Sequence, residues 1–191
     1  MIQKAIRVIG ALPSGIRRTL AGALAIGVCV IPNQTARMTR TNLRLAFPHL
    51  GWLRRQLLAC HSIYELAQKS FDIAATWVRP PGELARWVQS SEGLYVFLAL
   101  PADQPKLVLL PHLGNWELFG MWLSAYQPYT AMFRPLREQS LTDLVRDARM
   151  RGGNHLVPTD AGGLRQLVSA LRSGGAVIVL PDQSPHAGQG I

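Results

Sequence analysis

Acidic residues are missing from the first third of this sequence. None of the 11 Asp and Glu residues precedes Glu65, whereas nine of the 20 Lys and Arg residues do. The basic residues that follow are balanced by the acidic ones, so the net charge of +9 belongs to the first third. A basic segment without acids favours an anionic partner, either a membrane surface or nucleic acid. Because no helix-turn-helix, zinc or aromatic-platform pattern is present, we expect no nucleic acid partner.

Charged residues and cysteines are also few. Charged residues make up 16% of the sequence and hydrophobic ones 48%, whereas about 25% charged residues is typical of soluble domains. This shortage favours contact with something apolar. The two cysteines, Cys29 and Cys60, lie in apolar helical contexts without metal-ligand spacing. We therefore expect buried free thiols, no metal and no cysteine nucleophile, consistent with a reducing cytoplasmic compartment.

No apolar run is long enough for a clean transmembrane span. The apolar stretch Leu20–Ile31 would make about 18 Å of helix, against a hydrocarbon core of about 30 Å. The following Pro32-Asn33-Gln34 offers no small-residue cleavage site, which argues against a signal peptide. An interfacial or re-entrant anchor and a buried helix both remain open. The flanking Arg17 and Arg18 favour the membrane contact.

A basic stripe is predicted on the helix after this stretch. Thr35 could cap that helix, in which Arg37, Arg40 and Arg44 recur at helical spacing. A solvated face is the ordinary explanation of such a stripe. Here the stripe adjoins an apolar segment, which favours phosphates of lipid or the acidic surface of a carrier protein.

Prolines and glycines divide the first hundred residues into helical segments. Further helices are expected over Met1–Ile9, Trp52–Val78 and Glu83–Leu100. We expect residues 1–100 to form a helical, basic, membrane-proximal part, and residues 101–191 an α/β part of the same structural domain.

From residue 107 onward, strand patterns alternate with helical ones. Expected strands are Leu107–Leu110, Thr130–Phe133, His155–Val157 and Ala176–Leu180; expected helices are Asn115–Ala125, Leu141–Arg151 and Gly163–Arg172. This alternation predicts an α/β fold with a parallel or mixed sheet flanked by helices. In such folds functional groups collect at the carboxyl ends of the strands.

Three polar residues stand directly after predicted strands, namely His112, Arg134 and Asp182. Since the carboxyl ends of parallel strands share one edge, these residues predict a shared site. Asp182 could fix a substrate or hold a loop, although an Asp in a Pro- and Gly-rich turn is usually a turn former. His155 and His186 are expected to be incidental.

His112 and Glu117 are five residues apart, so on one helix they would point about 140° away from each other. They can meet only if His112 precedes the helix, across a turn made by Gly114 and Asn115. Asn115 would then be the N-cap, with Glu117 in the first turn near the positive end of the dipole. This pair would act as a general base on a substrate hydroxyl. The alternative is a strand-end histidine and a solvated acid.

The segment PHLGNWELFG, residues 111–120, resembles the H-x4-D/E block of the glycerolipid acyltransferase superfamily. Its Gly-Asn-Trp-Glu interior is similar to the branch of bacterial lipid A biosynthesis (lauroyl/myristoyl) acyltransferases. Other blocks of that family are resembled in order by Arg40-Thr41-Asn42-Leu43-Arg44, Phe47-Pro48, Phe133-Arg134-Pro135 and Gly174-Gly175 through Pro181-Asp182-Gln183. The resemblance covers nearly the whole chain.

The resemblance implies a glycerolipid-acyltransferase-like fold and transfer of a fatty acyl chain to a hydroxyl of a lipid A precursor. The donor would be acyl carrier protein or acyl-CoA as a co-substrate, with no metal or other cofactor. His112 and Glu117 would be catalytic, and Arg134 would bind a phosphate or a phosphopantetheine arm. Arg137 is a weaker candidate for the same role, and the remaining substrate-binding candidates are Asn115 and Asp182.

The family resemblance also implies partners and a place, namely acyl carrier protein, a glycolipid acceptor and the anionic cytoplasmic face of the bacterial inner membrane. Rival predictions are an acyltransferase for another glycolipid, such as a mannoside, or for a lysophospholipid, and a non-catalytic membrane-binding homologue. The sequence stops where the resemblance would continue into another apolar strand. We therefore expect C-terminal elements to be missing.

Overall fold

The computed structural model describes residues 2–101 and 103–182, so Gln183 and His186 lie outside the described residues. By compactness the chain divides into two units. One unit is Ala5–Ala75, and the other runs from Thr76 onward and includes the first residues of the chain. The change from helices alone to alternating strands and helices comes later, between Ala99 and Lys106.

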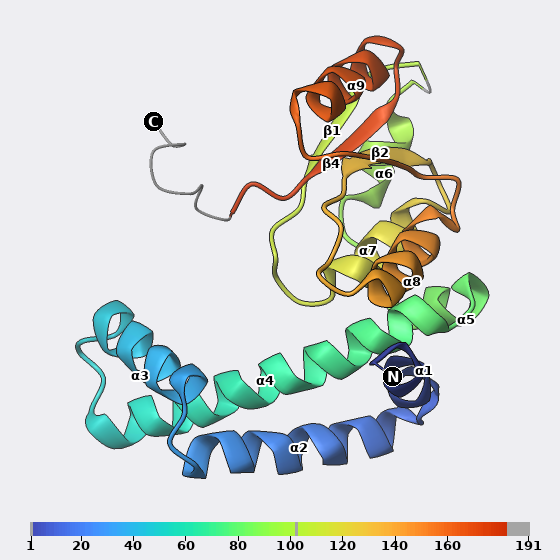
Figure 1. Cartoon of the computed structure of the whole chain (residues 1–191). Helices are drawn as coiled ribbons and strands as arrows, with labels where there is room; N and C mark the ends of the chain where they lie inside the picture. Colours follow the sequence, from blue (N-terminus) through green and yellow to red (C-terminus); the bar gives the residue numbers. More distant parts are fainter. Residues whose placement is uncertain (1, 102, 183–191) are drawn as a thin grey trace. The chain divides into compact units, whose positions relative to one another are not determined.

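The unit Ala5–Ala75 is made of helices (Figure 1). They are α1 (Ile2–Ala11), α2 (Ser14–Val30), α3 (Gln34–Ala46) and α4 (Trp52–Val78), the last with the predicted bounds. Asn33, not the predicted Thr35, caps α3, and its side chain accepts a hydrogen bond of 2.9 Å from the N–H of Ala36. Asn33 takes this position because its backbone is extended directly before the first helical turn.

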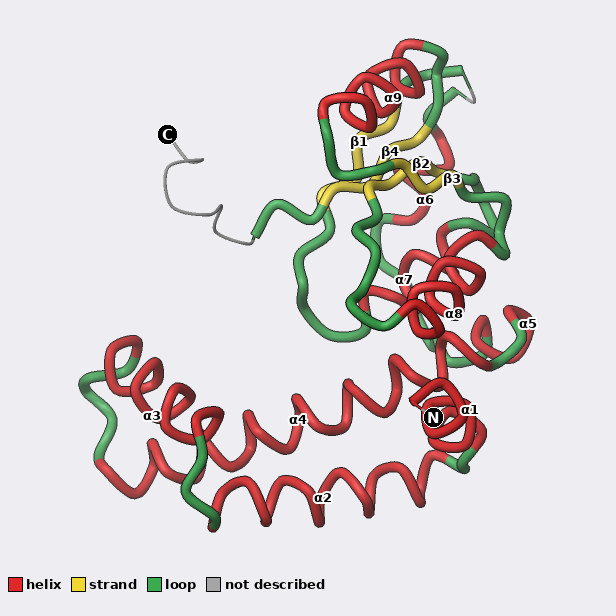
Figure 2. Tube along the Cα trace, viewed as in Figure 1, coloured by secondary structure: helices red, strands yellow, loops and turns green. Residues whose placement is uncertain are grey.

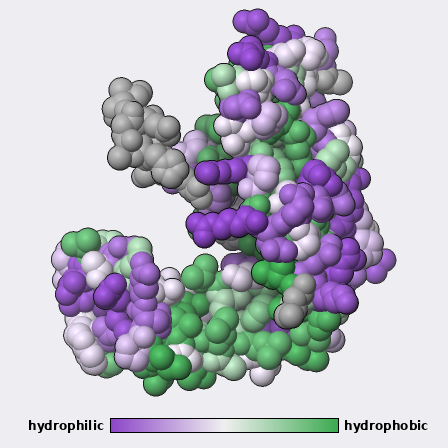
Figure 3. All heavy atoms as spheres, in the orientation of Figure 1, coloured by the Kyte–Doolittle hydropathy of each residue, from purple (hydrophilic) through white to green (hydrophobic). Residues whose placement is uncertain are grey.

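Small side chains form the interior of this unit, where Ala25 and Ala36 pack with Ile63. Arg17 is 2% exposed and lies 3.1 Å from the carboxylate of Asp72, which neutralises a charge that burial would otherwise make costly. The small interior residues leave the larger aliphatic side chains of α2 on the surface. These exposed residues are Ile16, Leu20, Leu24, Ile26 and Val30, and Figure 3 shows hydrophobic side chains gathered over α2.

No single helix within the described residues is long and apolar enough to cross a membrane. Helices α2 and α3 satisfy length and composition only when taken together, and they are bent by 79° at the break between them.

The predicted helix Glu83–Leu100 is wrong, because the structure has two short helices there. They are α5 (Pro81–Ala85) and α6 (Leu94–Ala99). Gly93, which precedes α6, has a φ of 74°. That left-handed conformation suits glycine and interrupts an α-helix.

A parallel four-stranded sheet forms the centre of the second unit (Figure 2). Its strands are β1 (Lys106–Leu109), β2 (Tyr129–Met132), β3 (His155–Val157) and β4 (Ala176–Val179), in the order β1-β4-β2-β3. The connecting helices are α7 (Trp116–Leu123), α8 (Gln139–Met150) and α9 (Ala161–Arg172). The predicted α/β fold with a parallel sheet and preceding helices is confirmed.

Strand β4 provides the core on both faces of the sheet, because successive side chains of a strand point to opposite faces. Ala176 and Ile178 pack with Leu123 of α7, whereas Val177 packs with Leu167 of α9. Figure 1 shows α9 on one face of the sheet and α7 on the other. The interior position of β4 explains its uninterrupted apolar sequence.

Strand β1 lies at one edge of the described sheet, and its aliphatic side chains are only partly buried. Leu107 and Leu109 are 56% and 63% exposed, and β4 is the one neighbour of β1 among the described strands. Lys106 is buried instead, and its Nζ donates a 2.9 Å hydrogen bond to the carbonyl of Pro101. This ammonium also lies 5.6 Å from the centre of the Phe97 ring.

Candidate active site

The register of β1 on β4 brings His112 and Asp182 together. Each residue of β1 pairs with the residue 70 positions later in β4, for example Leu109 with Val179. His112 and Asp182 each stand three residues beyond this last pair, with the same separation of 70. The parallel strands therefore deliver both side chains to the same edge of the sheet.

Two hydrogen bonds join this pair. The Nδ1 atom of His112 lies 2.8 Å from Oδ1 of Asp182, and the main-chain N–H of His112 donates to Oδ2 at 2.7 Å. These bonds lower the pKa of Asp182 below its usual value, with the imidazole bond as the largest cause. The Trp116 ring lies edge-to-face with the imidazole, 5.2 Å between ring centres. The Asp182 carboxylate and the Trp116 ring thus both hold the imidazole in place.

Glu117 is bound by another residue. It lies in the first turn of α7, as predicted, and is 6% exposed. Both of its carboxylate oxygens accept hydrogen bonds from Arg149 of α8, at 2.6 Å from Nη2 and 3.0 Å from Nε. The sequence predicts that Glu117 meets His112 in a general-base pair, whereas in the structure Asp182 is the carboxylate hydrogen-bonded to the imidazole.

The Glu117–Arg149 ion pair changes the acid–base properties of its surroundings. Burial works against the charge of Arg149, but the hydrogen bonds and charge of Glu117 outweigh it and raise the pKa of Arg149. Burial, together with the negative charge of Glu117, raises the pKa of Tyr129 to about 12. The phenol therefore stays protonated throughout the neutral range and can donate a hydrogen bond.

Asn115 caps α7, as predicted, and its side-chain oxygen accepts from the N–H of Leu118 at 3.1 Å. Its amide nitrogen donates to Thr76 at 3.0 Å. Gly114 makes the turn before the cap with a φ of 63°, which favours glycine. The structure thus uses both ends of the Asn115 side chain to fix the loop between His112 and α7, and a direct role in substrate binding stays a prediction.

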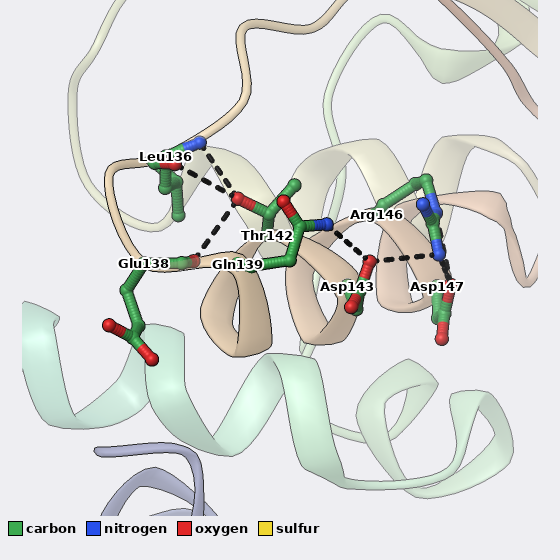
Figure 4. Close-up of polar contacts among 7 residues, drawn as sticks. All are labelled: Leu136, Glu138, Gln139, Thr142, Asp143, Arg146 and Asp147. Atoms are coloured by element: carbon green, nitrogen blue, oxygen red, sulfur yellow. Dashed lines mark hydrogen bonds and ion pairs between the residues drawn. The ribbon is translucent and has the colours of Figure 1, made fainter. Parts of the chain in front are cut away.

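Arg134 and Arg137 lie in the loop after β2. Both are exposed, and only Arg134 lines the cavity that contains His112. Thr142 of α8 is 4% exposed and holds this loop (Figure 4). Its hydroxyl accepts from the N–H of Leu136 at 2.9 Å and lies 3.2 Å from the carbonyl oxygens of Leu136 and Glu138.

A cavity of about 380 Å³ lies beside His112 and Arg134. His112, Glu117, Arg134, Tyr129 and Arg149 are among its polar lining residues, and apolar side chains from β2 and β4 complete the wall. A second cavity, of about 480 Å³, lies along α7 and is mostly apolar, with Phe97, Phe119 and Trp122 in its lining. Among the described residues, no group of three or more His, Cys, Asp and Glu could hold a metal ion.

The arrangement can perform general base catalysis. An imidazole with Nδ1–H donated to a carboxylate carries its lone pair on Nε2, where it can accept a proton. Arg134 adds positive charge at the same cavity, which suits a phosphate or a developing oxyanion. Asp182 is hydrogen-bonded to the imidazole, and an attacking hydroxyl supplied by a substrate stays a prediction.

Sequence reasoning missed two features of this site. It gave Asp182 a minor role and said nothing of Arg149. A signal for the first was present, because LVLLPH and VIVLPD, residues 107–112 and 177–182, share one pattern of four aliphatic residues, a proline and a polar residue. Nothing in the sequence distinguishes Arg149 from its helical neighbours.

Comparisons with known proteins agree on one family. The family described as bacterial lipid A biosynthesis acyltransferase matches residues 2–191. A lipid A biosynthesis palmitoleoyltransferase of Escherichia coli is 27% identical over 147 residues, covering 76% of this chain and 47% of the relative. A lipid A biosynthesis acyltransferase of Shigella flexneri has the same identity and coverage.

A phosphatidylinositol mannoside acyltransferase of Mycolicibacterium smegmatis is 32% identical over 69 residues, covering 36% of this chain and 23% of that relative. The chain spans about half the length of the first curated relatives it matches.

Proposed function

The chain belongs to the bacterial lipid A biosynthesis acyltransferase family, and from that premise we propose that it transfers a fatty acyl chain from a carrier thioester to a hydroxyl of a lipid A precursor. The observation that carries the proposal is the His112–Asp182 pair at the carboxyl ends of β1 and β4. His112 lines the same cavity as Arg134. A general base beside a cationic group is what direct acyl transfer to an alcohol requires.

The reaction proceeds in two stages. Nε2 of His112 removes the proton of the acceptor hydroxyl as its oxygen attacks the thioester carbonyl carbon, and Asp182 stabilises the imidazolium that forms. The tetrahedral intermediate then collapses, the carbon–sulfur bond breaks, and the thiolate takes the proton back from the imidazolium. The products are an ester and a free thiol.

The oxyanion needs hydrogen-bond donors near the His112 loop. Among the backbone N–H groups of this loop, that of Leu113 already donates to the carbonyl of Pro111 at 2.7 Å, so we assign the role to those of Gly114 and Asn115. They stand at the N-terminus of α7, where the helix dipole favours negative charge. Arg134 is the alternative donor, and it could instead bind a donor or acceptor phosphate.

Glu117 acts by position in this scheme. Its ion pair with Arg149 joins the first turn of α7 to α8 and so fixes the helix that follows the His112 loop. Asp182, by contrast, bonds the imidazole itself. We therefore assign the orienting role to Asp182, and treat the predicted His112–Glu117 pair as the alternative that the experiment below tests.

The remaining elements of the function are an acyl chain site and partners. The mostly apolar cavity along α7 suits the hydrocarbon chain, since a hydrocarbon gains free energy from leaving water. Acyl carrier protein or CoA would supply the thioester without another cofactor. The basic first third suits the anionic cytoplasmic surface of an inner membrane, where the glycolipid acceptor would be met.

A mass-spectrometric transfer assay tests the proposal. The chain would be incubated with acyl carrier protein thioesters and an underacylated lipid A precursor, and product would be a one-acyl increase in mass. We expect His112→Ala to abolish transfer. Asp182→Asn should lower kcat about 100-fold, because an asparagine NH2 donates to Nδ1 and selects the tautomer without a lone pair on Nε2. Glu117→Gln should retain more activity than Asp182→Asn at a temperature where both are folded; the reverse order would restore the His112–Glu117 pair.

A mannoside acceptor is the second candidate, because the Mycolicibacterium relative carries that name. Product from a phosphatidylinositol mannoside, and none from the lipid A precursor, would favour it. If neither acceptor reacts, the same assay is repeated with the chain extended by the homologous C-terminal segment of the Escherichia coli relative. Vesicle binding without turnover in both chains would favour a non-catalytic homologue.

A further inference from the structure

A second basic pocket lies in the unit Ala5–Ala75, between α3 and the start of α4. It measures about 340 Å³, and its lining includes Arg37, Arg40, Arg44, Arg55, Gln56 and Trp52. The predicted stripe of three arginines on α3 thus becomes one wall of a pocket, and α4 contributes a fourth arginine to it.

Two of the four arginines are held in place by the protein. Arg40 donates from Nε to Gln56 at 3.0 Å and from Nη2 to the carbonyl of Cys29 at 2.8 Å. Arg55 donates to the carbonyl of Pro48 at 3.2 Å. Because a guanidinium has five N–H donors, these bonds orient each group and leave further donors for a ligand.

The pocket lacks a counter-charge. The two carboxylates of this unit are engaged elsewhere, since Glu65 pairs with Lys69 at 3.7 Å and Asp72 pairs with Arg17 at 3.1 Å. Arg37 and Arg44 are exposed and make no side-chain hydrogen bond or ion pair within the described part of the chain. The four arginines around this pocket therefore attract an anion that is not part of the protein.

We propose that this pocket binds the phosphate headgroup of an anionic membrane lipid. One guanidinium can donate two parallel hydrogen bonds to a phosphate group. A cluster of four therefore suits a doubly charged phosphate. This pocket is remote in sequence from His112, and its binding of phosphate does not depend on the acyl transfer proposed above. It is tested by binding alone.

Apolar side chains around the pocket identify the ligand as a lipid. Trp52 belongs to the pocket lining and is 69% exposed. Leu53 and Leu57 follow on α4 and are 63% and 64% exposed. A tryptophan between a charged headgroup site and an exposed aliphatic surface matches the interface of a bilayer, where one end of the ring is apolar and the other wet. A hollow of about 340 Å³ also suits a compact headgroup better than the broad surface of an acidic protein.

The test compares two double variants that remove the same charge from the full chain. Arg37→Gln/Arg44→Gln changes the pocket without removing a protein contact. The matched control is Arg18→Gln/Arg54→Gln, whose residues are exposed and lie outside the pocket lining. Vesicle affinity is measured at physiological ionic strength on phosphatidylcholine vesicles containing phosphatidic acid, and on vesicles of equal zeta potential containing oleate. Circular dichroism melting verifies that both variants are folded.

Diffuse attraction alone contributes about fivefold in affinity per arginine near an anionic membrane, or about thirtyfold for two, so losing two from the pocket should weaken binding to phosphatidic acid vesicles by clearly more than about thirtyfold. The control should lose clearly less, and the wild type should prefer phosphatidic acid to oleate. Equal losses in the two variants would overturn the pocket and leave diffuse attraction.

Two further arms separate the sources of the anion. Glycerol 3-phosphate binding that requires the pocket, without a pocket effect on vesicles, would show a site for soluble phosphates and overturn the lipid. If Arg37→Gln/Arg44→Gln loses binding to acyl carrier protein while its affinity for vesicles is unchanged, the pocket binds an acidic protein. That result would also overturn the lipid as its ligand.

Discussion

Replacing Glu117 by Gln is expected to lower the free energy of unfolding by about 3 kcal/mol. Glu117 is 5% exposed at its side chain and neutralises Arg149, which is 28% exposed. Removal of one partner from a buried ion pair typically costs about 3–5 kcal/mol, because the other charge stays desolvated. The lower end applies here, since the guanidinium keeps some access to water and lies 5.4 Å from the centre of the Phe133 ring.

Helix α8 offers a matched control in Asp143→Asn. The Asp143 carboxylate lies 3.2 Å from Arg146, and the two side chains are 41% and 45% exposed (Figure 4). Both variants replace one carboxylate by its amide and take it from an arginine of the same helix. An exposed ion pair contributes about 0.5 kcal/mol or less, so the control should hardly change the free energy of unfolding.

Urea unfolding followed by tryptophan fluorescence measures this difference. Four of the five tryptophans belong to the unit that contains the ion pair, namely Trp77, Trp87, Trp116 and Trp122, so the signal reports mainly on that unit. The midpoint should fall with little change in slope. The reasoning is refuted if Glu117→Gln loses no more than Asp143→Asn. Adding Arg149→Met to Glu117→Gln should recover part of the loss, since it removes the stranded charge.

Three further predictions concern titrating groups. The pKa of Asp182 is depressed, so the contribution of its carboxylate to folding stability is fully present above the ordinary aspartate pKa and is lost as the pH falls through the lowered value. In His112→Ala, carboxyl-carbon NMR should show the pKa of Asp182 rising toward the ordinary value. No rise would contradict the His112–Asp182 hydrogen bond. Ultraviolet titration should detect a tyrosine ionising near pH 12, and Tyr129→Phe should remove that step and no other. Burial raises the pKa of Cys29 to about 11, so iodoacetamide at pH 8 should label it slowly unless urea is present; equal rates would contradict this.

From β1 onward, local sequence signals predicted the helices and strands well. The Asn115 cap, the left-handed Gly114 and the alternation of strands with helices depend on neighbouring residues, and the structure has them. Helix α4 likewise begins and ends where its apolar pattern does. Errors occurred where competing local signals were close together, as with Thr35 and Asn33.

The partners of the site residues could not be predicted in the same way. Asp182 reaches His112 because β4 inserts beside β1, and strand order is a property of the whole sheet. Glu117 pairs with a residue 32 positions later, and its distance from His112 in sequence gave no hint of that competitor. The exposure of Leu107 also depends on strand order, because an aliphatic run fits an edge strand and an interior strand alike.

The pairing of β1 with β4 also determines when the site can form during synthesis. The strands are separated by 70 residues, so at about 5–20 residues per second β1 precedes β4, its partner among the described strands, by about 4–14 s. Throughout that interval none of the described strands is available to pair with β1, which invites pairing with other chains. His112 is translated early but is oriented only after the last described strand is in place. A ribosome that stalls before Asp182 would therefore present an aggregation-prone chain with no assembled base.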